Sequence, residues 1–129
     1  MTEPNLCFIG GGNMASAMIG GLVSSGYPAS KVVACDINRE TLQQLAAKFS
    51  IATETDVNTA VGNADCIILA VKPQVMQSLC SSITQTGHKP LFISIAAGLR
   101  ETDINRWLGG NQSMVRCMPN TPALLRLGA

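Results

Sequence analysis

Charged, aromatic and histidine residues are scarce in this chain of 129 residues. Only 13% of the residues are charged, 4% are aromatic, and His88 is the one histidine. The formal net charge of +1 provides no basic surface for nucleic acid. No apolar run approaches the roughly 18 residues that a membrane span requires, and residues 1–5 do not resemble a signal peptide. We therefore expect a cytoplasmic protein that binds neither nucleic acid nor membranes.

Metal-site and disulfide patterns are also missing, although the chain has five cysteines. No two cysteines form a C-x-x-C pair, and His88 precedes Lys89-Pro90 in a predicted surface loop. Cysteines in predicted strands are Cys7, Cys35, Cys66 and Cys117, and Cys80 falls on the apolar stripe of a predicted helix. This placement predicts buried free thiols that behave as small hydrophobic side chains, and no metal site.

Short apolar runs alternate with helical periodicity along the whole chain, and 47% of the residues are hydrophobic. The predicted strands cover 6–9, 31–35, 51–53, 66–71, 91–96 and 114–118. The predicted helices cover 13–25, 39–49, 56–61, a segment beginning at Pro73, and 101–108. Such alternation, in a chain of one-domain length, predicts an α/β fold with a doubly wound parallel sheet of strand order 3-2-1-4-5-6.

The helix beginning at Pro73 carries an apolar stripe at helical spacing. Its members are Val75, Met76, Leu79, Cys80 and Ile83. We interpret this stripe as ordinary hydrophobic core that faces the sheet.

A glycine-rich turn follows the first predicted strand, with the sequence Phe8-Ile9-Gly10-Gly11-Gly12-Asn13-Met14-Ala15. Gly10 would permit a tight turn, Gly12 would let a diphosphate approach the backbone, and Ala15 would let the helix lie close to the strand. Glycines in a turn can be purely structural. A strand before the turn and a helix after it favour dinucleotide binding at the helix N-terminus.

Asp36 follows the second predicted strand, 26 positions after Gly10. A carboxylate there would accept the adenosine ribose hydroxyls and repel a 2′-phosphate, which favours NAD. Arg39 could instead attract that phosphate and favour NADP. Asp36 and Asn38 could also simply cap the helix that begins at Arg39. We expect Asp36→Ser to raise the affinity for NADPH relative to NADH.

Three further strand ends combine small or rigid residues with few polar groups. They are Ala70-Val71-Lys72-Pro73, Ala96-Ala97-Gly98 and Met118-Pro119-Asn120-Thr121-Pro122. Turn formation explains any one of them, but three on one edge of a sheet point to a ligand site.

These segments together, with the glycine turn, closely resemble pyrroline-5-carboxylate reductases over nearly the whole chain. The resemblance implies a Rossmann-type domain and hydride transfer from NAD(P)H to the C=N bond of 1-pyrroline-5-carboxylate. The product is L-proline, in the last step of proline biosynthesis. Such an imine needs alignment and exclusion of water more than a protein nucleophile.

The resemblance also implies which residues contact the coenzyme. They are Ile9, Gly10, Gly11, Gly12, Asn13, Met14, Asp36, Arg39, Ala70, Val71, Lys72, Pro73, Ala96, Ala97, Gly98 and Asn120. The catalytic group is unknown and is expected in the part of the enzyme missing from this chain, and Lys72 is the candidate within it. NADP is usual in the family, whereas Asp36 favours NAD.

Members of the family continue into a helical domain that dimerises and binds the substrate, and this domain is absent from the chain. We expect residues 1–122 to form the NAD(P)-binding domain and 123–129 to begin the connection. The apolar segment 122–127 should self-associate or be disordered. The full enzyme is expected to be a homo-oligomer, and the isolated chain to be inactive. The alternative is a nucleotide-binding or sensing module without catalysis.

Overall fold

A computed structural model describes residues 3–83, 90–95, 99–110 and 112–116. Several sequence predictions lie outside these residues. They concern Ala96, Ala97 and Gly98, His88, Cys117, Asn120 and the segment 122–127.

Six parallel strands form one sheet in the order β3-β2-β1-β4-β5-β6, which confirms the predicted order. The strands are β1 (Leu6–Ile9), β2 (Val32–Cys35), β3 (Ala52–Glu54), β4 (Cys66–Leu69), β5 (Leu91–Ser94) and β6 (Ser113–Arg116). The helices are α1 (Asn13–Ser24), α2 (Arg39–Phe49), α3 (Val57–Val61), α4 (Pro73–Ser82) and α5 (Glu101–Trp107), with a 3₁₀ turn at Ala29–Lys31. The predicted α/β fold class is therefore confirmed.

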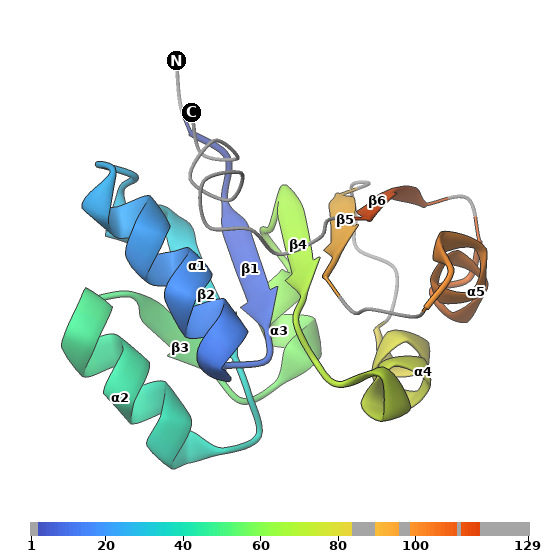
Figure 1. Cartoon of the computed structure of the whole chain (residues 1–129), viewed down its shortest axis with the longest axis horizontal. Helices are drawn as coiled ribbons and strands as arrows, with labels where there is room; N and C mark the ends of the chain where they lie inside the picture. The colour runs from blue at the N-terminus through green and yellow to red at the C-terminus, as the bar shows by residue number, and fades with distance from the viewer. Residues whose placement is uncertain (1–2, 84–89, 96–98, 111, 117–129) are drawn as a thin grey trace.

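Helices cover both faces of the sheet (Figure 1), as a parallel sheet requires. Helices α1 and α2 pack with Leu6 and Phe8 in one hydrophobic cluster. Helices α3, α4 and α5 pack with Cys7 and Ile9 in the other. Successive residues of β1 thus enter opposite clusters, which explains why this strand is apolar throughout.

Element boundaries differ from the sequence predictions by one or two residues. Lys31 ends the 3₁₀ turn that follows Pro28, so β2 begins one residue later than predicted. Strand β4 ends at Leu69, which leaves Ala70 and Val71 in the loop before α4. A strand begins or ends where the backbone joins or leaves the sheet, and hydrophobicity alone does not mark that point.

The prediction that Val75 of α4 belongs to the hydrophobic core is wrong. Met76 and Cys80 are fully buried, and Leu79 and Ile83 pack partly against the same cluster. Val75, in contrast, is 44% exposed. The apolar stripe is therefore narrower than the sequence predicted, because Val75 lies on the edge of the helix that faces solvent.

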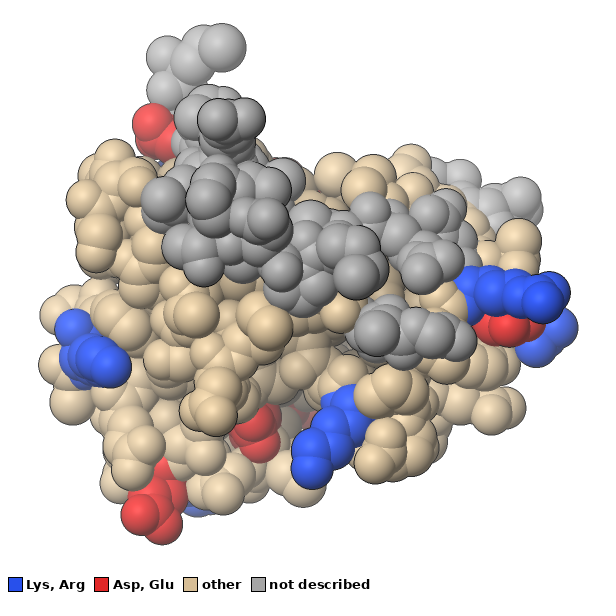
Figure 2. Space-filling view, in the orientation of Figure 1, with Lys and Arg blue, Asp and Glu red and all other residues tan. Residues whose placement is uncertain are grey.

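Charged side chains are sparse on the surface as well. Figure 2 shows a few scattered groups of both signs on one face, with blue and red atoms touching at the right edge, and no continuous basic patch on that face. Among the described residues, no helix is both long enough and apolar enough to cross a membrane.

Candidate functional site

The carboxyl ends of three neighbouring strands meet at one edge of the sheet. Ile9 at the end of β1 is in register with Cys35 of β2 on one side and Leu69 of β4 on the other. The chain leaves β1 for α1 on one face, and leaves β4 for α4 on the opposite face (Figure 1). This is the topological switch point, where open α/β sheets bind their ligands.

Gly10 makes the first tight contact at this edge. Its φ of +103° belongs to a region that side chains rarely adopt, and a Cβ there would lie 2.7 Å from the Ala70 carbonyl oxygen. The Gly10 N–H donates to the Cys35 carbonyl at 2.7 Å, and the Ala70 N–H donates to the Ile9 carbonyl at 2.9 Å. Glycine at position 10 therefore joins the ends of β1, β2 and β4, as the predicted tight turn requires.

Gly12 occupies the N-cap position of α1 in an extended conformation, and no side chain caps this helix. A Cβ on Gly12 would meet nothing within 4 Å, so the space above it is open. The backbone N–H groups in the first turn of a helix have no acceptor within the helix itself. Gly12, Asn13 and Met14 are exposed, so their backbone is accessible to a ligand.

Asp36 lies beside the glycine turn and is half-buried. Its Oδ2 accepts the Gly11 N–H at 2.8 Å, and its Oδ1 accepts the Asn38 N–H at 2.9 Å. The cap of α2 is Asn38, whose Oδ1 accepts the N–H groups of Glu40 and Thr41 at 3.0 and 3.2 Å. The helix-cap interpretation is thus confirmed for Asn38, whereas the carboxylate of Asp36 bonds to the glycine turn.

Arg39 is the first residue of α2 and is exposed. Together with Thr53, Glu54 and Thr55 it lines a shallow cleft of about 250 Å³ at the end of β3. The guanidinium side chain therefore belongs to the same sheet edge as Asp36, on the side towards β3.

Ala70, Val71, Lys72 and Pro73 connect β4 to α4. Val71 is half-buried, and its Cγ1 would lie 3.2 Å from a Cβ on Gly10, so this loop packs under the glycine turn. Lys72 is the exposed N-cap residue of α4, and Pro73 takes the first helical position as predicted. The structure thus brings the loops after β1, β2 and β4 together.

An exposed apolar residue at this edge was missed from the sequence. Ile37, directly after Asp36, is 92% exposed, and Met14 and Val75 are 43% and 44% exposed. A large aliphatic side chain between two turn-forming residues, Asp36 and Asn38, was the available signal. It was missed because an isolated apolar residue in a loop has no periodicity.

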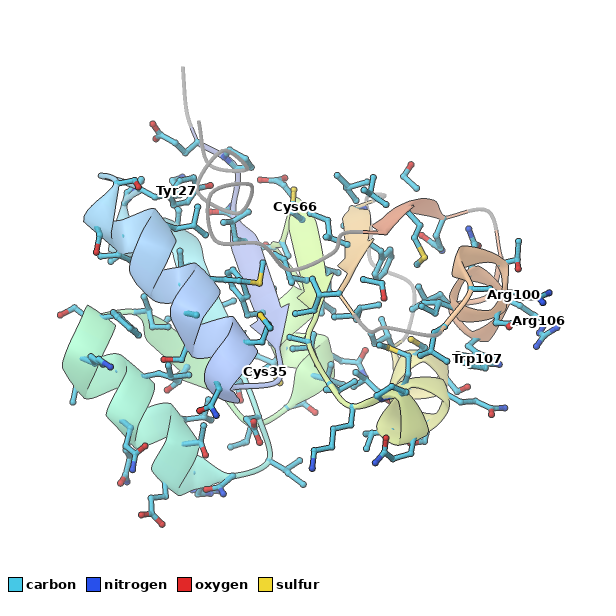
Figure 3. All side chains as sticks on the ribbon, viewed as in Figure 1. Tyr27, Cys35, Cys66, Arg100, Arg106 and Trp107 are labelled. Atoms are coloured by element: carbon cyan, nitrogen blue, oxygen red, sulfur yellow. The ribbon has the colours of Figure 1, made fainter. Side chains whose placement is uncertain are left out.

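The thiols in the described part of the chain are free, and Cys7, Cys35 and Cys80 are buried as predicted. Cys66 is only half-buried, because it begins its strand. Burial raises the pKa of Cys7 to about 12 and the pKa values of Cys35 and Cys80 to about 11. Cys35 lies at the end of β2 (Figure 3), but a protonated thiol is a poor nucleophile and a poor metal ligand.

A second hollow lies away from these loops. A cavity of about 600 Å³ is lined by Val33, Thr53, Ala60 and Asn63, between β2, β3 and α3. Near its rim, polar groups satisfy one another, because the Asn5 N–H donates to Asp65 Oδ2 at 2.8 Å. Its lining includes Leu6 and Val32, the first residues of β1 and β2, so it lies away from the carboxyl ends of these strands and we assign no site to it.

Comparisons with known proteins agree with the predicted resemblance. A "Pyrroline-5-carboxylate reductase" from Pseudomonas aeruginosa is 44% identical over 131 residues, which cover 100% of this chain and 48% of that protein. A solved pyrroline-5-carboxylate reductase from Coxiella burnetii has a TM-score of 0.88 and 35% identity, covering 97% of this chain and 47% of that one.

A Plasmodium falciparum pyrroline carboxylate reductase solved with NADP bound has a TM-score of 0.81 and 25% identity, and covers 97% of this chain and 45% of that one. The chain thus spans about half the length of the curated relatives it matches. The family described as "NADP oxidoreductase coenzyme F420-dependent" matches residues 5–98. On this match, which extends over most of its length, the chain belongs to that family of oxidoreductases.

Proposed function

We propose that this chain binds NAD(P)H and forms the coenzyme-binding half of a pyrroline-5-carboxylate reductase. The observation that carries the proposal is the start of α1, where Gly12 leaves open space above backbone N–H groups that no side chain caps. A diphosphate placed there would accept those N–H groups and meet the positive end of the helix dipole. A Cβ at position 12 would fill the same space, so the residues present fit the group.

The backbone donors for the diphosphate are those of Gly12, Asn13 and Met14. The N–H groups of Gly10 and Gly11 already donate to Cys35 and Asp36. Ile9, Gly10 and Gly11 therefore shape the turn without supplying these donors, and Ile9 and Gly11 are themselves buried.

The adenosine half would lie over the loop between β2 and α2. Each oxygen of Asp36 accepts one backbone N–H and retains a lone pair for a ribose hydroxyl. Ile37 presents an exposed apolar side chain next to it, suited to an adenine ring. A carboxylate at this place favours NADH, whereas Arg39 offers a cation for the 2′-phosphate of NADPH. We propose a preference for NADH.

The nicotinamide half would lie towards the loop Ala70 to Pro73. The resemblance also implies coenzyme contacts from Ala96, Ala97, Gly98 and Asn120, which lie outside the described residues. Lys72 could attract the substrate carboxylate, or it could extend its stem along the coenzyme with its ammonium in solvent. We propose the second role, because Lys72 is exposed at the N-cap of α4, where its ammonium can remain in solvent.

The reaction would add a hydride to the C=N carbon of 1-pyrroline-5-carboxylate, whose ring nitrogen is protonated, and so give L-proline. Bound NAD(P)H supplies the hydride, and the chain holds the diphosphate and adenosine so that the reduced ring has one position. Residues 1–122 would form the coenzyme domain, and 123–129 would begin the connection to a substrate-binding and dimerising half. We place the enzyme in the cytoplasm.

The test is a titration of the purified chain with NADH and NADPH, followed by nicotinamide fluorescence and calorimetry. We expect saturable binding with tighter affinity for NADH, and negligible proline formation. If neither coenzyme binds at millimolar concentrations, the proposal is wrong. Turnover of about 1 per second or more by the 129-residue chain would contradict the half-enzyme assignment.

A nucleotide-binding or sensing module without catalysis is the second candidate, because the same open helix start would serve a protein that binds the nucleotide without chemistry. Translation of the gene beyond Ala129 distinguishes the two. A following Ser/Thr-Pro-Gly-Gly-Thr-like helical segment supports the reductase.

A further inference from the structure

We propose that Asp36 is a positioning residue for the diphosphate-binding turn, in addition to any contact with the ribose. The proposal rests on the proposed function and deepens it. Its basis is the bond from the Gly11 N–H to Asp36 Oδ2 at 2.8 Å, which ties the middle of the glycine turn to the end of β2.

Two successive N–H groups of the turn are held by the same partner segment. The Gly10 N–H donates to the Cys35 carbonyl at 2.7 Å, and the Gly11 N–H donates to the Asp36 carboxylate. The next residue, Gly12, begins the uncapped end of α1. Fixing positions 10 and 11 therefore fixes the direction in which the following N–H groups point.

Asp36 is itself held on two further sides. Its Oδ1 accepts the Asn38 N–H at 2.9 Å, and its own N–H donates to the Glu54 carbonyl at 3.3 Å. Asn38 in turn caps α2. A continuous set of hydrogen bonds thus links the start of α2, through one carboxylate, to the start of α1.

The surroundings of Gly11 make this bond difficult to replace with water. Gly11 is buried, and a Cβ there would lie 2.8 Å from Thr41 Cγ2 and 3.1 Å from Leu45 Cδ1. Helix α2 therefore covers the turn closely. Without the carboxylate, a buried N–H would lose its acceptor, and the turn would shift to satisfy it.

The charge of Asp36 and its role as an acceptor can be separated by substitution. Asp36→Asn removes the charge and keeps one acceptor oxygen, which can retain the Gly11 N–H while the N–H of the exposed Asn38 bonds to water. Asp36→Ala removes both, and in Asp36→Ser the hydroxyl is one bond too short to replace Oδ2. If the residue only repels a 2′-phosphate, all three variants should bind NADPH equally well.

The experiment measures the dissociation constants of NADH and NADPH for the wild-type chain, Asp36→Asn and Asp36→Ala. Amide hydrogen exchange of Gly11 is followed by NMR without nucleotide. We expect Asp36→Ala to bind NADPH about fivefold more weakly than Asp36→Asn. We also expect the Gly11 N–H to exchange about tenfold faster in Asp36→Ala than in Asp36→Asn. Glu3→Gln, which removes an exposed charge before β1, at the end of the strand opposite the glycine turn, is the matched control and should change neither quantity.

Equal or tighter NADPH binding by Asp36→Ala than by Asp36→Asn would overturn the positioning role and leave the proposed function intact. Rapid exchange of the Gly11 N–H in the wild-type chain would overturn it as well, even if a variant failed to fold. A wild-type chain with a protected Gly11 N–H that binds neither coenzyme would instead refute the proposed function.

Discussion

The starts of α1 and α2 lie side by side at one edge of the sheet, yet they are built differently. Helix α2 begins with Asn38, whose side chain accepts hydrogen bonds from two backbone N–H groups, and has Glu40 in its first turn. Helix α1 begins with Gly12, has no side-chain cap and carries no acidic residue in its first turn. One end is complete without a ligand, whereas the other leaves its donors for an anion.

Helix α1 is stabilised along its length instead of at its end. Ala15, Met18, Ile19 and Leu22 are buried against the sheet. Burial of large apolar side chains contributes about 1.5–3 kcal/mol each, more than a cap contributes. The comparison shows that a well-packed helix can leave its N-terminus open for binding without losing its place in the fold.

The largest expected effect comes from Gly10→Ala. The positive φ and the 2.7 Å approach to the Ala70 carbonyl oxygen involve backbone on both sides, so the methyl group cannot be accommodated by a side-chain movement. We expect a loss of about 3 kcal/mol in the free energy of unfolding, measured by urea denaturation. An unchanged stability would contradict the proposed joining of three strand ends.

Gly12→Ala should have the opposite result: a small loss of stability and a large loss of coenzyme affinity. Its methyl group enters open space, so we expect a stability loss of at most about 1 kcal/mol. The same methyl group would occupy the position of the diphosphate, so NADH affinity should fall about tenfold or more. Calorimetry measures the NADH affinity of both glycine variants. Equal affinity for Gly12→Ala and the wild-type chain would contradict diphosphate binding at the start of α1.

Asn38→Ala tests the completed end. The variant loses the acceptor for the Glu40 and Thr41 N–H groups, but its own N–H can still donate to Asp36. We expect a loss of about 1 kcal/mol in the free energy of unfolding. Asn38→Ser should retain most of the stability, and equal melting temperatures for the Ala and Ser variants would show that the cap is unimportant.

Ile37→Thr tests the apolar residue between the two helix starts. Because this side chain is 92% exposed, we expect no measurable change in stability. Loss of an adenine contact should weaken NADH binding about threefold. The matched control is Val115→Thr, an exposed apolar residue on β6. If both variants bind NADH as the wild-type chain does, Ile37 does not contact the adenosine.

The smallest expected effect is on the pH dependence of stability. It concerns Asp56, the charged N-cap residue of α3, whereas the N-cap residue of α2 is the neutral Asn38. A hydrogen bond from the Thr59 hydroxyl, followed by one from its N–H, lowers the pKa of Asp56 below its usual value. A lowered folded-state pKa stabilises the fold above the unfolded pKa of about 4, and this contribution is lost as the pH falls below it. The stability difference between the wild-type chain and Asp56→Asn should therefore shrink from pH 7 to pH 3. A stability difference that stays constant from pH 7 to pH 3 would show that the charge of Asp56 does not cause it.

The predicted strand order rested on the doubly wound arrangement that alternating strands and helices favour. Hydrophobic alternation and turn chemistry located the individual strands and the position of Pro73 at the start of α4. They also located Asp36 at the end of β2. These features depend on local sequence, because strand length, helix capping and glycine turns are encoded within a few residues.

Contacts between segments could not be predicted in the same way. The carboxylate of Asp36 bonds to Gly11, 25 residues earlier, and nothing in the sequence around either residue indicates that bond. The exposure of Val75 depends on how α4 is rotated against the sheet, and Ile37 lies in a loop without periodicity. Each of these requires the tertiary arrangement.

The labelling rates of the buried cysteines report how the sheet and its helices open. Cys7 on β1 and Cys80 on α4 are both completely buried, in the same cluster but on different elements. Because both side chains are completely buried, and burial raises the pKa of Cys7 to about 12 and that of Cys80 to about 11, an alkylating reagent can modify them only after the cluster opens to water. Equal labelling rates at the two positions would mean that strand and helix separate in one cooperative event, and faster labelling of Cys80 would mean that α4 detaches first.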